Sequence, residues 1–105
     1  MSLGAELRVG EQTVDAATLD VSRGGCRVEV DRLLPEGDTI AVSLFPTVDG
    51  VREAGFEPLR IGAEIRWSAE TEATSGLRFI AGLQFVAISD AQGDWLEAIV
   101  ARSQA

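Results

Sequence analysis

The chain has 105 residues, the size of one domain with a core of its own, and 46% of them are apolar. Its formal net charge of −8 works against nonspecific binding to DNA, RNA or anionic lipid. It contains no histidine, the most common general base and metal ligand, and its single cysteine excludes an intramolecular disulfide.

The first half of the chain has the pattern of four short strands separated by turns. We expect the strands at Glu6–Val9, Thr13–Val21, Cys26–Val30 and Thr39–Phe45. Apolar and polar side chains alternate strictly in the third strand, which is typical of a strand with one buried face. Pro46 is expected to end the fourth strand, because proline cannot donate to the sheet ladder.

The second half begins with an irregular connection, from Pro46 to Pro58, which is the longest in the chain. Alternation resumes at Leu59–Trp67 and places Trp67 on the inward face. A polar loop is expected at Ser68–Gly76, followed by a long strand at Leu77–Ile88.

The C-terminal segment has the pattern of an amphipathic helix from Asp90 to Arg102. Ser89 and Gln92 have the spacing of a capping box, in which the two side chains satisfy each other's backbone amides. One apolar stripe follows, formed by Trp95, Leu96, Ile99 and Val100. Six or so short strands and one terminal helix predict a mainly β domain over residues 1–105, either an antiparallel barrel or a sandwich.

The most informative segment lies between the second and third predicted strands. It places Asp20, Ser22 and two glycines in a tight turn. Gly24 and Gly25 can adopt the positive φ that such a turn requires. Asp20 and Ser22 are short polar side chains that can either bond the local backbone or contact a ligand, and the residues alone leave both readings open.

The pattern Asp-x-Ser-x-x-Gly, formed by Asp20, Ser22 and Gly25, resembles the signature turn of the PilZ domain family. This family consists of small bacterial β-barrel modules, many of which bind cyclic di-GMP. The likeness covers almost the whole chain, since it extends to the C-terminal helix and to Pro35–Gly37, Ile65–Trp67 and Gly82–Phe85. It implies a six-stranded antiparallel barrel of the split-barrel type, and a signalling role in motility, pili, exopolysaccharide or a similar output. It implies no cofactor other than this regulatory ligand.

The resemblance also implies a binding site. In it Asp20 and Ser22 hydrogen-bond a guanine base, and Gly25 lets the ligand approach the backbone closely. A carboxylate suits the N–H groups of guanine. Arg23, inside the turn, could reach a phosphate, as could Arg27 if its face of the strand points outward. The predicted ligand-binding residues are Asp20, Ser22, Arg23 and Gly25.

One family feature is missing. Members that bind the nucleotide typically carry Arg-x-x-x-Arg just before the first strand, whereas here only Met1 to Ala5 precede the first predicted strand. A hydrogen bond to a charged group contributes about 1.5–3 kcal/mol, so two absent guanidiniums remove about 3–6 kcal/mol, or roughly 10²- to 10⁴-fold in affinity. The alternative is a degenerate, PilZ-like adaptor that binds a protein partner and no nucleotide.

Such an adaptor needs a contact surface. Apolar residues in and around the long connection could form one, or could instead cap the barrel core: Phe45, Val48, Val51 and Phe56.

We expect neither catalysis nor a metal site. No histidine is present to activate a nucleophile, and Cys26 falls on the inward face of its strand, as a small buried apolar residue would. The acidic residues lack the spacing of a calcium loop. No apolar run approaches the roughly 18 residues of a membrane span and no secretory signal is visible, so we expect a cytoplasmic protein without membrane insertion.

Overall fold

The computed structural model describes residues 2–48, 51–52, 57–71 and 79–103. The chain is mainly β with one C-terminal helix, as the sequence predicts. The elements in chain order are β1 (Ser2–Val9), β2 (Gln12–Val21), β3 (Gly25–Val30), β4 (Thr39–Val48), β5 (Val51–Arg52), β6 (Leu59–Glu70), β7 (Phe79–Val86) and α1 (Asp90–Ser103).

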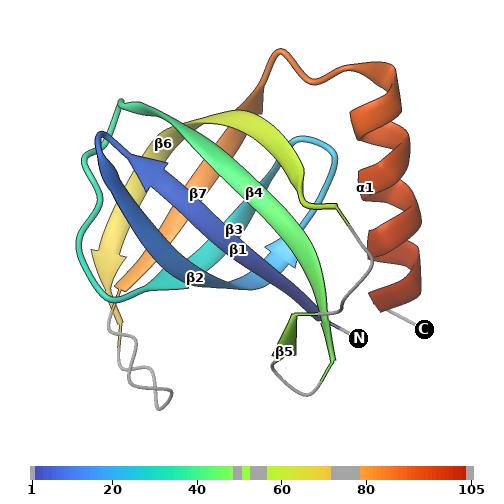
Figure 1. Cartoon of the computed structure of the whole chain (residues 1–105). Coiled ribbons are helices and arrows are strands. Elements are labelled where there is room, and N and C mark those ends of the chain that lie inside the picture. Colours follow the sequence, from blue (N-terminus) through green and yellow to red (C-terminus); the bar gives the residue numbers. More distant parts are fainter. Residues whose placement is uncertain (1, 49–50, 53–56, 72–78, 104–105) are drawn as a thin grey trace.

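Six strands close into an antiparallel barrel in the order β1-β2-β3-β7-β6-β4, and β1 pairs with β4 to complete the ring (Figure 1). The two-residue strand β5 pairs with β4 and lies outside the ring. Closure removes the exposed sheet edges that a sandwich would have to protect. The predicted six-stranded barrel is therefore confirmed.

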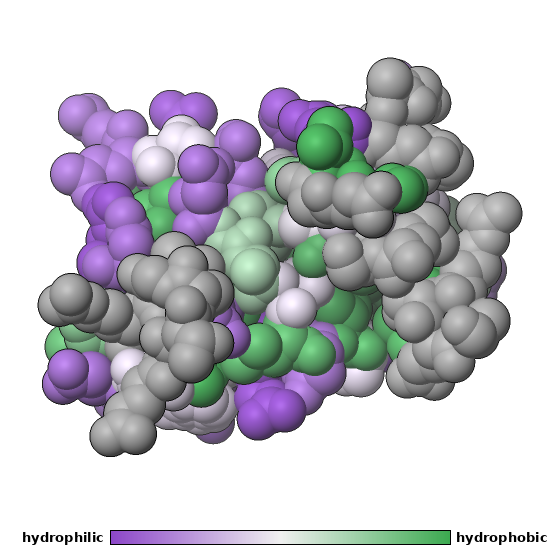
Figure 2. All heavy atoms as spheres, turned by 90° about the horizontal axis from the view of Figure 1, so that it is seen from below, coloured by the Kyte–Doolittle hydropathy of each residue, from purple (hydrophilic) through white to green (hydrophobic). Residues whose placement is uncertain are grey.

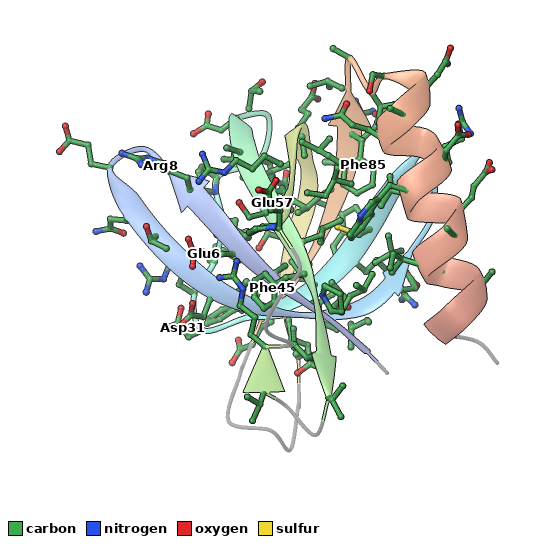
Figure 3. The ribbon with its side chains drawn as sticks, turned by 45° about the vertical axis from the view of Figure 1, so that its right-hand side comes forward. Glu6, Arg8, Asp31, Phe45, Glu57 and Phe85 are labelled. Atoms are coloured by element: carbon green, nitrogen blue, oxygen red, sulfur yellow. The ribbon has the colours of Figure 1, made fainter. Side chains whose placement is uncertain are left out.

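Alternate side chains of each strand fill the barrel. On β1, Leu7 is fully buried, whereas Glu6 and Arg8 are exposed on the outer face (Figure 3). The residues of the core come from every strand of the ring and include Val28, Val42, Leu44, Ile65 and Leu83.

The helix α1 lies alongside the barrel, near the turn between β2 and β3 (Figure 1). Its apolar stripe packs inward, with Leu96 and Ile99 buried. The capping box is confirmed: the Ser89 amide donates to Gln92 Oε1 at 2.8 Å, and the Gln92 amide donates to Ser89 Oγ at 3.1 Å. Within the part of the chain that is described, no helix is long and apolar enough to cross a membrane.

The prediction that Pro46 ends the fourth strand is wrong, because β4 continues to Val48. Pro46 pairs opposite Leu3 of β1, between the last residue that pairs with β6, Leu44, and the first that pairs with β5, Thr47. One side of β4 has no strand partner there, so a residue without an N–H is tolerated.

Other predicted boundaries also differ. β1 begins at Ser2 rather than Glu6, and β6 runs on to Glu70, so the predicted polar loop begins later than Ser68. β7 is shorter than predicted because Ala87, with a φ of +53°, ends it; the predicted start of this strand, residues 77–78, lies outside the described residues.

Candidate functional site

The turn between β2 and β3, here called the signature turn (Asp20–Gly25), is held by its own backbone. The Ser22 amide donates to the Gly25 carbonyl at 2.8 Å, and the Ser22 hydroxyl donates to the same oxygen at 3.3 Å. The Asp20 carboxylate instead accepts a hydrogen bond from the Arg27 side chain of β3. Both Asp20 and Ser22 are exposed, so the turn presents a carboxylate and a hydroxyl on the surface.

The expected positive φ at Gly24 and Gly25 is wrong. Among the described glycines, positive φ occurs at Gly10 and Gly37. Gly25 has a different reason to be glycine: a Cβ there would clash with the Leu83 carbonyl oxygen of β7 and would lie 3.2 Å from its carbonyl carbon. The close approach of two strands, rather than the turn conformation, requires this residue.

Two β-bulges reorient the side chains around this turn. In β2, Thr18 pairs with Val28 and Asp20 with Arg27, so that Leu19 is an extra residue. A bulge opposes two residues to one and reverses the faces of the residues that follow it. Strict alternation from Val14 would bury Asp20, whereas the bulge turns its carboxylate outward beside Arg27.

The second bulge explains why the prediction of an inward Trp67 is wrong. In β6, Ile65 pairs with Leu83 and Trp67 with Gly82, which leaves Arg66 as the extra residue. Trp67 therefore leaves the inward face and is 40% exposed. Its indole lies against Gly82, where a Cβ would clash with the ring.

These strands surround an open pocket of about 230 Å³. Its walls come from β2, β3, β6 and β7, and the lining residues are Asp20, Ser22, Gly25, Cys26, Arg27, Arg66, Trp67, Gly82 and Leu83. The structure thus brings together three of the four predicted site residues. It adds Arg66 and Trp67, which the sequence pattern does not identify as site residues. Alternation alone would leave Arg66 on the outer face, but only the bulge brings Trp67 to this surface.

Two arginines give the pocket positive charge. Arg27 is exposed and donates from Nε to Asp20 Oδ2 at 2.6 Å, and this bond raises the pKa of Arg27. Arg66 pairs with Glu64, with 3.1 Å between Nη1 and Oε1. Both pairs are solvent-exposed, so a ligand anion can compete with either carboxylate at small cost.

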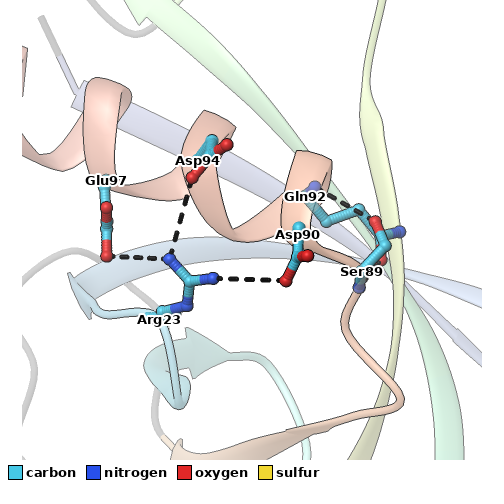
Figure 4. Close-up of polar contacts among 6 residues, drawn as sticks. All are labelled: Arg23, Ser89, Asp90, Gln92, Asp94 and Glu97. Atoms are coloured by element: carbon cyan, nitrogen blue, oxygen red, sulfur yellow. Dashed lines mark hydrogen bonds and ion pairs between the residues drawn. The ribbon is translucent and has the colours of Figure 1, made fainter.

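Arg23 is the fourth predicted site residue, and its side chain does not line the pocket. It extends to α1, where its guanidinium lies 2.9 Å from Glu97, 3.9 Å from Asp94 and 4.0 Å from Asp90 (Figure 4). The hydrogen bond to Glu97 raises the pKa of Arg23. Arg23 and Arg27 are four residues apart, yet their side chains bond to different elements.

Cys26 lines the pocket and is buried, as predicted. Burial, followed by the charge of Asp20, raises the pKa of its thiol to about 12. A thiol with this pKa is not a nucleophile near neutral pH. Across the described ranges, no group of three or more Cys, Asp or Glu side chains is arranged to hold a metal ion.

Comparisons with known proteins agree with the fold. The family model described as PilZ domain matches residues 1–102. None of the curated proteins matches the chain.

Three solved structures resemble the fold. The PilZ domain of YcgR from Escherichia coli, solved with cyclic di-GMP, has a TM-score of 0.76 at 14% identity, and the match covers 97% of this chain and 81% of that one. MotI/DgrA, the inhibitor of motility of Bacillus subtilis, has a TM-score of 0.74 at 15% identity, with 99% of this chain and 47% of that one covered. PlzA of Borreliella burgdorferi, solved in complex with cyclic di-GMP, has a TM-score of 0.58 at 12% identity, with 96% and 44% covered. This chain therefore spans about half the length of MotI and of PlzA.

Proposed function

Since this chain belongs to the PilZ domain family, we propose that it is a regulatory module that binds cyclic di-GMP in the pocket beside the signature turn, and not an enzyme. The observation that carries the proposal is the pocket itself, which gathers Asp20, Ser22 and Gly25 with an exposed indole and two arginines. Two of the similar proteins were solved with cyclic di-GMP. Control of motility, pili or exopolysaccharide through a protein partner is the output we propose.

The base contacts follow from chemistry. The exposed Asp20 carboxylate accepts N–H groups of guanine, and the Ser22 hydroxyl adds a second polar contact. The Trp67 indole lies against Gly82 of β7 and is exposed, so it offers a stacking surface for a base. Stacking of a base on an aromatic side chain contributes about 1–3 kcal/mol.

Phosphate contacts are assigned to Arg27 and Arg66. Both line the pocket and both are exposed. Each bonds one carboxylate and retains other N–H donors for a phosphate oxygen. In this proposal they supply the positive charge that Arg-x-x-x-Arg supplies elsewhere in the family, which offsets part of the affinity loss expected from the missing motif.

Calorimetric titration with cyclic di-GMP tests the proposal. Wild type is expected to bind, and Asp20→Asn is expected to weaken binding about ten- to hundredfold, because charged hydrogen bonds to the base are lost. Trp67→Leu is expected to weaken it roughly five- to hundredfold through lost stacking. Asp15→Asn makes the same charge change elsewhere on β2, at an exposed position, and is expected to bind like wild type.

Tryptophan fluorescence gives a second reading of the same site. The chain has two tryptophans, so ligand quenching should persist in Trp95→Phe and disappear in Trp67→Phe. Equal affinities for wild type, Asp20→Asn and Trp67→Leu would contradict this placement of the ligand.

The adaptor alternative has one observation in its favour. Val48 and Val51 are 49% and 68% exposed at the β4–β5 hairpin. Figure 2, which views the molecule from the end where β5 lies in Figure 1, shows apolar atoms on this face. Phe45 is half-buried beneath the guanidinium of Arg52, which is 4.7 Å from the ring centroid, and Phe56 lies outside the described residues.

If the chain is an adaptor, cyclic di-GMP should produce no heat at millimolar concentration. A protein partner should then be lost in Val51→Asp and retained in Trp67→Leu. Loss of the partner in Trp67→Leu alone would instead place the contact at the pocket.

A further inference from the structure

Three carboxylates form a row along one face of α1 and meet a single arginine of the signature turn. Asp90, Asp94 and Glu97 are spaced i, i+4 and i+7, so they lie one above another on the helix. Like charges at this spacing repel. The guanidinium of Arg23 lies within 4.0 Å of all three and hydrogen-bonds Glu97 (Figure 4).

A glycine of α1 leaves room for the guanidinium of Arg23 on the helix surface. Gly93 is buried beneath it, and a Cβ at Gly93 would lie 2.5 Å from Arg23 Cζ and 2.6 Å from Nη2. Glycine is among the least favourable residues in a helix interior. Here it stands at the position where any side chain would displace Arg23.

Arg23 is also adjacent in sequence to a residue of the pocket. Its neighbour Ser22 lines the pocket, and the Arg23 side chain is 44% exposed. An arginine side chain turns about four single bonds, so the guanidinium can leave α1 for a phosphate group without a change in the backbone of the turn.

From this geometry we propose that α1 and the ligand compete for Arg23. The carboxylates of α1 lower the affinity for cyclic di-GMP by holding Arg23, and ligand binding withdraws Arg23 and loosens α1. This inference rests on the proposed function. The two effects are equal in size, because coupling between two equilibria is reciprocal. Exposed ion pairs are weak, so a two- to fivefold change in affinity is expected.

The sign of three substitutions tests the competition. Glu97→Gln and Gly93→Ala should each tighten cyclic di-GMP binding about two- to fivefold, because both free Arg23 from α1. Arg23→Gln should weaken binding, because the phosphate contact is lost. Gly93→Ala keeps every charge, and Glu11→Gln, in the β1–β2 turn at the other end of β2, controls for the net-charge change of Glu97→Gln.

Hydrogen exchange measures the other half of the coupling. Addition of cyclic di-GMP should speed amide exchange in the Asp90–Glu97 part of α1 in wild type. In Arg23→Gln these amides should already exchange faster without ligand and should not respond further to it.

Two results would overturn the inference, and they differ in what they mean for the proposed function. If wild type binds while Glu97→Gln and Gly93→Ala bind equally well or more weakly, Arg23 merely positions the turn, and the proposed function stands. If neither wild type nor Gly93→Ala binds cyclic di-GMP, the proposed function fails and the competition fails with it.

Discussion

Replacement of Gly25 by alanine is expected to destabilise the barrel by roughly 2–4 kcal/mol, whereas the same replacement at Gly24 should leave stability unchanged or raise it by up to about 1 kcal/mol. The difference comes from what each new methyl group meets. At Gly25 it would clash with the Leu83 carbonyl oxygen and lie 3.3 Å from Gln84 Cα, both backbone atoms of β7. Backbone atoms can yield only if the β3–β7 pairing from Gly25 onward opens.

Gly24 is the matched control. No atom lies within 4 Å of a Cβ built there, and its φ is not positive. Urea unfolding followed by circular dichroism measures both variants, and a lower midpoint at unchanged slope would identify a loss of stability. Equal midpoints for Gly24→Ala and Gly25→Ala would contradict the close approach of β7.

Much of the barrel could be predicted from local patterns, because its strands have one buried and one exposed face. Period-two alternation identifies the inward residues of β3 and the first part of β6, and the capping box identifies the start of α1. Alternation fails at the two bulges, since an extra residue reverses the faces after it and leaves no local trace in the sequence. The prediction of an inward Trp67 fails for this reason, and Asp20 reaches the surface only because of the bulge at Leu19.

The candidate site could be predicted only in part for a related reason. Asp20, Ser22 and Gly25 lie within one short segment, so a local motif identifies them. The Glu97 carboxylate that holds Arg23 is 74 residues away in the chain. Contacts between such distant residues depend on how α1 docks on the barrel, which the periodicity of the helix does not specify.

Raising the pH from 9 to 12 is expected to lower the free energy of unfolding by about 3 kcal/mol through a single thiol. Burial raises the pKa of Cys26 from 9.0 to about 12 in the folded chain. Well below pH 9 the thiol is protonated in both states, and its contribution to stability is fully present. Between pH 9 and 12 the unfolded chain loses the proton while the folded chain largely keeps it, so stability falls by up to about 1.4 kcal/mol per pH unit in the middle of this range.

The composition of the chain allows this loss of stability between pH 9 and 12 to be assigned to the Cys26 thiol. The chain has no tyrosine, and all nine of its cationic side chains are arginine, so no lysine titrates in this range either. Arginine stays protonated to above pH 12, and the α-amino group titrates near pH 8.

Denaturant unfolding at pH 9, 10 and 11 should therefore show a steady loss of stability in wild type. Cys26→Ala removes the thiol, so this variant should be less stable at pH 9, through the small cavity, but nearly flat above it. Parallel decline of wild type and Cys26→Ala would mean that the thiol ionises as readily in the folded barrel as in the unfolded chain, and its burial beneath the pocket would then be wrong.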